Sequence, residues 1–260
     1  MNIEKSVRTV KVTRYVTPLR EGGSLPAIIE ADDDGLYVLK FRGAGQGPKA
    51  LIAELIAGEI ARRLGLQMPD IVLADLDKEL GRTEPDPEIQ DLIKASVGWN
   101  LAVDYLPGSI TFDPLVDKID EELASRIVWF DAFVTNVDRT ARNPNMLIWH
   151  KELWLIDHGA ALYFQHAWDN WEQASQSPFI QIKDHVLLPR ANAISDVDKE
   201  LRECLTREVF ENIVSSIPDE WLDDFDPAAR RSIYVEFLQK RLGSANIFVE
   251  EAKRARENSI

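Results

Sequence analysis

Alternating hydrophobic and polar positions make the first part of the chain β-rich. Short runs of apolar and β-branched residues have the length and the pattern of strands. We expect strands at 7–16, 25–30, 36–41, 71–76 and 99–106. One stretch departs from this pattern, because after Pro48 leucine and isoleucine recur at helical spacing until Gly65. Proline at the start and glycine at the end are typical helix boundaries, so the sequence predicts a β-rich region that carries one helix.

After the breaker Pro107-Gly108 the pattern becomes that of helices. Acidic residues at 120–122 favour the start of a helix, and an apolar stripe at helical spacing follows over 123–134. Most of the remaining chain is helical in pattern as well. The expected fold class is therefore α+β, with a β-rich part at 1–106 and a mostly helical part at 107–260.

Composition places the chain among globular proteins. It has 260 residues, of which 45% are hydrophobic and 28% are charged, enough to bury a sizeable core. The one cysteine, Cys204, gives no disulfide framework and fits a reducing compartment. The N-terminus lacks the apolar run of a signal peptide, and no stretch approaches the roughly 20 apolar residues that span a bilayer. We expect a soluble, cytoplasmic protein without a membrane partner.

The charge balance argues against nucleic-acid binding. The formal net charge is −14, spread along the chain rather than gathered in one segment. An acidic surface repels phosphate backbones, so we expect no nucleic-acid partner. The simplest role of this charge is to keep the surface soluble.

A polar loop before a predicted hairpin carries the residues best suited to chemistry. Within 135–159 the chain leaves a helix, passes Asp138 among asparagines and arginines, and enters an apolar hairpin at 146–149 and 153–156 that ends at Asp157. Aspartate and asparagine are ordinary loop and cap residues, so none of them is informative alone. The ordered set of aspartate, asparagine, apolar hairpin and Asp-x-Gly is a more specific signal.

The hairpin brings an asparagine close to an aspartate. With a turn centred on Lys151, Met146 lies opposite Asp157, and neighbouring strands are about 5 Å apart. Asn145 and Asp157 then converge on one point, with the Asp138 loop alongside. Carboxylate and amide oxygens suit Mg²⁺, with phosphate oxygens and water completing its shell. In such a site Asp138 would orient an acceptor hydroxyl and take its proton.

This segment resembles the catalytic core of the HipA-like serine/threonine kinases and, more distantly, of protein and phosphatidylinositol kinases. Asp138 matches their catalytic aspartate, and Asp157-His158-Gly159 matches the metal-binding Asp-Phe-Gly with histidine in place of phenylalanine. The family asparagine usually stands five residues after the aspartate, which is Asn143 here, whereas the hairpin favours Asn145. We prefer Asn145 and keep both as metal ligands. Thr140 occupies the place of a histidine often found after the Asp-Arg pair.

The resemblance extends to a lysine and a glutamate in the N-terminal part. Lys40 lies among apolar residues of a predicted strand, similar to the Val-Ala-Ile-Lys strand of kinases. A lysine in such surroundings is either at an exposed edge or paired with a polar group. The resemblance implies that Lys40 contacts nucleotide phosphates and pairs with a glutamate of the following helix. Glu54 matches the family position better than Glu59, and the two lie on different faces of the helix.

Two further segments have roles implied by their order along the chain. Gly22-Gly23-Ser24 precedes the lysine strand, where backbone amides of a glycine-rich turn can cradle phosphates, although such a turn is a weak signal alone. Asp104-Tyr105-Leu106 resembles a kinase hinge, where backbone groups pair with adenine. These two segments complete the expected nucleotide site.

The function implied is that of an ATP-dependent phosphotransferase with a bilobal, protein-kinase-like fold. ATP and Mg²⁺ are its expected cofactors, and a hydroxyl on a protein is its expected acceptor, with a lipid or small-molecule hydroxyl as a variant. A non-catalytic nucleotide-binding module is the alternative, because the asparagine is shifted and the loop histidine is missing. Transfer of a nucleotidyl group is a third possibility that no residue favours.

Overall fold

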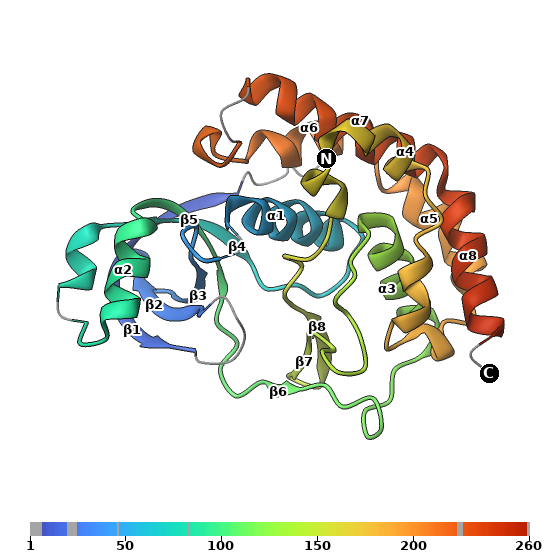
Figure 1. Cartoon of the computed structure of the whole chain (residues 1–260). Coiled ribbons are helices and arrows are strands. Elements are labelled where there is room, and N and C mark those ends of the chain that lie inside the picture. The colour runs from blue at the N-terminus through green and yellow to red at the C-terminus, as the bar shows by residue number, and fades with distance from the viewer. Residues whose placement is uncertain (1–6, 20–24, 46, 83, 223–225, 259–260) are drawn as a thin grey trace.

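The N-terminal strands build a small closed barrel (Figure 1). The computed structural model of the protein describes residues 7–19, 25–45, 47–82, 84–222 and 226–258. The barrel strands are β1 Arg8–Pro18, β2 Ala27–Ala31, β3 Leu36–Lys40, β4 Ile71–Leu76 and β5 Gly98–Asp104, in the order β1–β2–β3–β5–β4. All neighbouring pairs are antiparallel except β1 and β4, which run parallel and close the barrel.

The barrel has its own hydrophobic interior. Alternate residues along the strands, such as Val10, Ile29, Leu39 and Ala102, are buried in one cluster. The alternation of buried and partly exposed positions along β2 is what a period of two predicts for a strand with one buried face. The five predicted strands are therefore all present, with ends that differ from the expected ones by at most two residues.

Helix α1, Gly47–Arg63, lies between the barrel and the helical part (Figure 1). It is apolar around most of its circumference, and nine hydrophobic or small residues of its length from Leu51 to Ala61 are buried together with Glu54. A helix that is apolar all round has to be covered on all sides. It contacts β4 and β5 on one side and α6 on the other.

The helical part packs around α3, a helix that delivers the chain to the site. Its helices are α3 Glu121–Val134, α4 Trp171–Ser175, α5 Ile194–Glu203, α6 Arg207–Ser215, α7 Pro227–Gly243 and α8 Ala245–Glu257. The Asp120 side chain caps α3 by accepting from the Leu123 amide, and Thr135 ends it in the left-handed region, with φ 55°. A second sheet, in the order β6–β7–β8, consists of β6 Ile110–Thr111, β7 Met146–Trp149 and β8 Glu152–Leu155.

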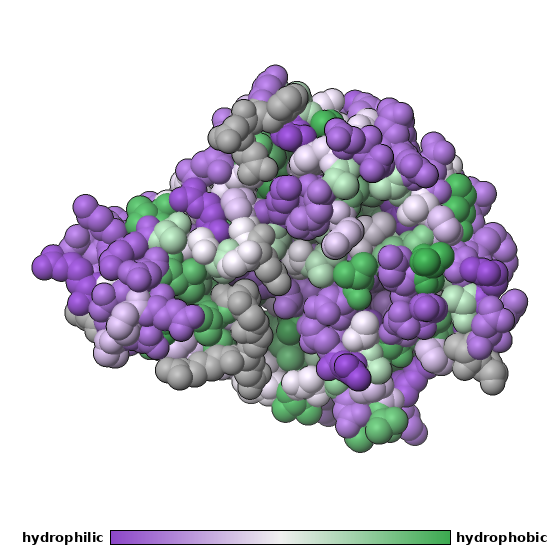
Figure 2. All heavy atoms as spheres, viewed as in Figure 1, coloured by the Kyte–Doolittle hydropathy of each residue, from purple (hydrophilic) through white to green (hydrophobic). Residues whose placement is uncertain are grey.

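Short 3₁₀ segments connect these elements. They are η1 Lys78–Gly81, η2 Tyr163–His166, η3 Trp168–Asn170, η4 Ile180–Asp184, η5 Leu188–Arg190 and η6 Asp219–Trp221. Four of them, η2 to η5, lie between β8 and α5. Among the described residues, none of the helices is long and apolar enough to cross a bilayer. Hydrophilic residues cover most of the face shown in Figure 2, and hydrophobic residues gather there only in small patches.

A buried arginine fixes the end of α3. Arg241 of α7 donates to the carbonyl oxygens of Ala132 at 2.5 Å and of Phe133 at 2.6 Å, and also to Ser175 and Ser177. Burial lowers the pKa of this guanidinium to about 9. The last carbonyls of a helix need partners, and Arg241 supplies them where the chain turns into the Asp138 loop.

Among its described residues, the N-terminal part holds two α-helices, not the one expected from the sequence. The second is α2, Pro87–Ala95, which packs Ile89 and Ile93 against the barrel interior. Asp86 caps it, and Pro87 occupies its first turn. Two buried residues make too short a stripe to stand out beside the prolines around it, and the flanking segment 81–87 has the composition of a loop.

The division at residues 106 and 107 stays a prediction. Residues 106 and 107 lie in the segment that connects β5 to β6. However, α1 shares its buried cluster with the helical part, while the barrel interior forms a separate cluster. The two parts are thus joined through α1 as well as through the chain.

Candidate active site

Lys40 joins two acidic side chains that come from distant segments. It ends β3, and its Nζ donates to Glu54 Oε2 of α1 at 2.7 Å and to Asp157 Oδ1 after β8 at 2.8 Å. Glu59, the other helix glutamate considered, has Arg62 within 3.8 Å instead. The site is therefore assembled from the barrel, the buried helix and the end of the hairpin.

Burial makes these charges depend on one another. The Lys40 side chain is 17% exposed and that of Glu54 is 1% exposed, whereas Asp157 is 52% exposed. Burial alone would lower the pKa of Lys40, but the charges of Glu54 and Asp157 outweigh it, and the pKa is raised. Burial would raise the pKa of Glu54, but the Lys40 charge and the hydrogen bond from His158 lower it to about 2. Lys40 and Glu54 therefore stay charged at neutral pH.

We expect Glu54 to contribute to unfolding by acid. Its pKa is about 2 in the folded protein, against an ordinary value of 4.5. A depressed pKa stabilises the folded state fully above the unfolded value, and this contribution, of up to roughly 3 kcal/mol, is lost as the pH falls through the folded value. In urea titrations, Glu54→Gln should therefore lose less free energy of unfolding than wild type between about pH 5 and pH 3. An equal loss in both proteins would contradict this assignment.

The hairpin is present, but its register differs from the expected one by two residues. Met146 lies opposite Leu155 rather than Asp157. The turn has two residues, His150 and Lys151, with φ values of 49° and 68°. A two-residue turn with both φ positive is the type that fits the twist of paired strands, and it makes Glu152 the first residue of the second strand. The expectation was wrong because pairing Met146 with Asp157 puts four residues in the turn, whereas the observed turn has two.

Asn145 still reaches Asp157 in the observed register. The Ile156 amide donates to the Asn145 carbonyl at 3.0 Å, and Asn145 Nδ2 lies 3.5 Å from the Asp157 carbonyl oxygen. Both Asn145 and Asp157 have left-handed backbone conformations, with φ 48° and φ 54°. Asparagine and aspartate tolerate this region better than most residues, although it remains strained for a side chain, and such strain is often found at functional sites.

The Asp138 carboxylate lies beside the two candidate metal-binding asparagines. Asp138 Oδ2 accepts from Asn143 Nδ2 at 2.8 Å and from Asn145 Nδ2 at 3.3 Å. The Asp138 amide in turn donates to the Asn136 side chain at 3.2 Å. With their amide nitrogens directed at Asp138, both asparagines keep their side-chain oxygens for another partner.

A buried ionic network lies beneath this loop and was not expected from the sequence. Asp131 of α3 pairs with Arg139 at 2.6 Å and with His185 at 2.9 Å, and it also accepts from Asn136 at 2.8 Å. Arg139 is fully buried and paired with Asp131, so it is not open to a phosphate at the surface of the site. The sequence did carry one sign of this network, which is Asp131 itself, because a carboxylate inside the apolar stripe of a helix requires buried partners.

Two of the backbone amides expected to bind adenine already donate to carbonyl oxygens within the fold. The Asp104 amide donates to the Asp70 carbonyl and the Tyr105 amide to the Leu36 carbonyl, both at 2.9 Å. Leu106 is buried. Gly22-Gly23-Ser24 lies outside the described residues.

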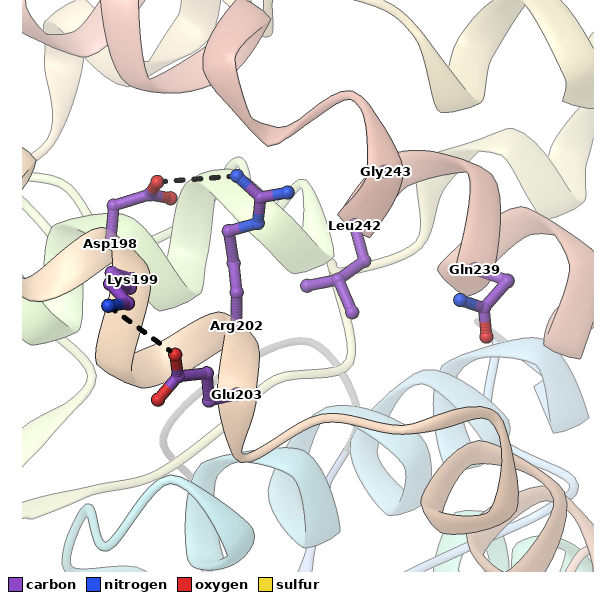
Figure 3. Close-up of a pocket in the computed structure, with 7 residues that line it drawn as sticks. All are labelled: Asp198, Lys199, Arg202, Glu203, Gln239, Leu242 and Gly243. Atoms are coloured by element: carbon purple, nitrogen blue, oxygen red, sulfur yellow. Dashed lines mark ion pairs between the residues drawn. The ribbon is translucent and has the colours of Figure 1, made fainter.

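Two of the cavities formed by the described residues open at the surface, and neither is lined by Lys40, Asp138 or Asp157. One of about 460 Å³ lies between α5 and α7, where the charged side chains of α5 pair along their own helix (Figure 3). The other, of about 510 Å³, is lined by Asp104 and Leu106 together with residues of the loop after α1 and of the hairpin. The chemically suited residues thus gather away from both cavities.

Known proteins resemble this chain in sequence and in fold. The sequence profile of the HipA-like kinases matches residues 12–248. Among solved structures, the Helicobacter pylori proinflammatory kinase CtkA is 16% identical, with a TM-score of 0.53, over 97% of this chain and 99% of that chain. The Golgi casein kinase with Mn/ADP bound is 10% identical, with a TM-score of 0.51, over 98% of this chain and 76% of that chain.

At such identities the two structures establish a kinase-like fold and no more. No curated protein sequence matches the chain. The family profile, in contrast, covers far more than half of the chain, including the segments that hold Lys40, Glu54, Asp138 and Asp157. The chain therefore belongs to the HipA-like kinase family, whose members are phosphotransferases.

Proposed function

We propose that the protein is an ATP-dependent kinase that transfers the γ-phosphate to a serine or threonine hydroxyl of another protein. The observation that carries this proposal is the convergence of Lys40 with Glu54 and Asp157, at 2.7 Å and 2.8 Å, from three distant segments. A partly buried lysine held between two carboxylates, one of them half exposed, is the arrangement needed to bind phosphates beside a metal ion. The lobes would be 1–106 and 107–260.

Asp157 and an asparagine are the residues that we assign to Mg²⁺. Their oxygens have the hard-donor chemistry that Mg²⁺ prefers, and the 52% exposure of Asp157 leaves its carboxylate open to a ligand. Asn145 is better supported than Asn143, because its side chain lies 3.5 Å from the Asp157 carbonyl oxygen. When bound, the metal neutralises charge that develops on the phosphates. The Mn/ADP named for the Golgi casein kinase supports the same class of cofactors.

Asp138 and Lys40 have separate tasks in this proposal. Lys40 binds phosphate oxygens while Glu54 holds its ammonium group in place. Asp138 accepts a hydrogen bond from the acceptor hydroxyl and takes its proton. The amides of Asn143 and Asn145 keep the Asp138 carboxylate directed into the site. Catalysis then consists mainly of positioning and of charge stabilisation.

Adenine and phosphate contacts complete the proposal. We assign phosphate binding to Gly22-Gly23-Ser24 and adenine binding to Asp104-Tyr105-Leu106. Because the Asp104 and Tyr105 amides already donate within the fold, the Leu106 amide is the donor of this segment that we assign to adenine. A net charge of −14 favours a protein acceptor with basic residues near its hydroxyl and disfavours nucleic acid. A cytoplasmic location belongs to the same proposal.

The experiment is a titration of Mg²⁺ in an assay that measures ADP formed from ATP. Wild type should show turnover that depends on Mg²⁺, and Asp157→Ala should lower it by about 10²-fold or more. Asp196→Ala, which removes an exposed aspartate of α5, is the matched control and should retain wild-type turnover. ATP consumption that is equally fast without Mg²⁺, or in Asp157→Ala, would contradict the metal assignment.

A further inference from the structure

His158 connects the two halves of the site through three contacts. Its side chain is buried, and its Nε2 lies 2.8 Å from Arg139 Nη2 beneath the Asp138 loop. Its backbone amide donates to Glu54 Oε2 at 2.6 Å. Its Nδ1 faces the other oxygen of the same carboxylate, Glu54 Oε1, at 3.8 Å. One side chain thus lies between the glutamate that holds Lys40 and the arginine under the loop.

The arginine determines which nitrogen of His158 carries the proton. A guanidinium has donors only, so His158 Nε2 must accept from Arg139 and is unprotonated. The proton of the imidazole is then on Nδ1, directed at Glu54 Oε1. Arg139 itself is held by Asp131 at 2.6 Å. This buried ion pair therefore determines that Arg139 donates to His158 and that His158 directs its own proton at Glu54.

The contact between His158 and Glu54 is nearly formed but remains open. His158 Nδ1 and Glu54 Oε1 are both buried and have no hydrogen-bond partner within the part of the chain that the structure describes. Their separation of 3.8 Å exceeds a hydrogen bond by about 1 Å. A small movement of α1 towards the hairpin would pair both atoms at once. A hydrogen bond between these two atoms would therefore form only when α1 and the hairpin have moved closer together, so its formation would distinguish that arrangement of the site from the present one.

We propose that His158 is a positioning residue that couples the Lys40–Glu54 pair to the Asp138 loop. This inference rests on the proposed function. In the structure Lys40 is shared between Glu54 and Asp157. If Asp157 were to hold a metal ion, Glu54 would be the remaining carboxylate partner of Lys40, and the His158 imidazole would close onto Glu54 and tie its position to Arg139. A phenylalanine at this place, as in the related Asp-Phe-Gly motif, has no nitrogen for either contact.

Three substitutions separate this role from simple packing. His158→Phe keeps a ring against Phe130, whose centroid is 5.5 Å away, but removes both nitrogen contacts. His158→Gln places an amide near Nε2 and keeps a partner for Arg139, while His158→Asn places one near Nδ1 and keeps a donor towards Glu54. We expect kcat/KM for ATP to fall about 100-fold in His158→Phe and about tenfold in each amide variant. A packing role predicts the reverse order, with phenylalanine the best tolerated.

A double-mutant cycle with Glu54→Gln measures the coupling directly. If the two side chains act as a unit, Glu54→Gln should cost at least about fivefold less in the His158→Phe background than in wild type. The inference would be overturned if the fold-loss in kcat/KM of the double variant equalled the product of the two single losses. It would also be overturned if His158→Phe retained kcat/KM within about twofold of wild type. The exposed His166→Gln is the control, and thermal unfolding shows that each variant is folded at the assay temperature.

The cycle also separates failure of this inference from failure of the proposed function. If wild type turns over ATP and the losses of the two substitutions simply multiply in the double variant, the coupling is rejected and the kinase proposal stands. Without turnover in wild type, the phosphotransfer proposal fails, and the same cycle measured on the Kd for Mg·ATP decides the coupling. Absence of both turnover and ATP binding would overturn both.

Discussion

Replacing Asp138 by alanine should lower kcat about 10³-fold or more while leaving the affinity for ATP within about threefold of wild type. The Asp138 carboxylate contacts Asn143 and Asn145, whereas Lys40, which we assign to the phosphates, pairs with Glu54 and Asp157. Loss of the base therefore removes an interaction with the acceptor hydroxyl and not with the nucleotide. Single-turnover transfer and calorimetric binding of Mg·ATP measure the two effects separately.

Asp138→Asn is the matched control for this substitution. It retains the size of the side chain but cannot take a proton, so it should be nearly as inactive as Asp138→Ala. Transfer that survives in both variants would contradict the role of Asp138 as the base. Inactivity accompanied by loss of ATP binding would indicate that the residue organises the loop instead.

The largest expected effect on stability is that of Asp131→Ala, at about 3–5 kcal/mol of unfolding free energy. Asp131 is fully buried and pairs with Arg139, which is also fully buried, and with His185. The charge of Arg139 holds the pKa of the Asp131 carboxyl well below its usual range, although burial alone would raise it. Removing the carboxylate leaves a buried guanidinium without its counter-charge. Urea unfolding of the purified variant measures the loss.

Two comparisons make this prediction specific. Arg139→Met in the Asp131→Ala background should recover part of the lost stability, because an apolar pair replaces an unpaired charge. Asp91→Ala removes an exposed ion pair with Lys94 and should cost less than about 1 kcal/mol. A loss for Asp131→Ala no larger than that for Asp91→Ala would contradict the account of the buried network.

Local patterns were sufficient to predict most elements of the fold. The strand at 71–76 and the first hairpin strand at 146–149 have the bounds expected from their apolar runs. The helix after Pro48 was predicted from its spacing and its glycine end, and α1 runs over Gly47–Arg63. Helix α2 was missed because its apolar face consists of only two buried residues, Ile89 and Ile93.

Residues that depend on tertiary contacts were harder to predict. The pairing of Lys40 with Glu54 rather than Glu59 follows from the face of the helix that meets the barrel, and the family resemblance pointed to it. The hairpin register depends on a His-Lys turn that lacks the usual Asn-Gly or Asp-Gly signal of a two-residue turn.

The network under the loop could not be predicted from one sequence. Asp131, Arg139 and His185 are separated by as many as 54 residues, and no local pattern indicates that they meet. The contact of His158 with both Arg139 and Glu54 has the same origin, since it depends on how α1 packs against the hairpin. A charged residue in an apolar stripe shows that a partner is needed but does not show which one.

Transfer of the γ-phosphoryl group of ATP to a hydroxyl is tested most directly by following labelled ATP. ATP labelled at the γ or at the α phosphate is incubated with wild type and Mg²⁺, with the protein itself and a serine- and threonine-rich test protein as acceptors. We predict that the γ label appears on serine or threonine while the α label leaves in ADP. Transfer of the α label with release of pyrophosphate, or binding of ATP with neither label moving, would contradict it.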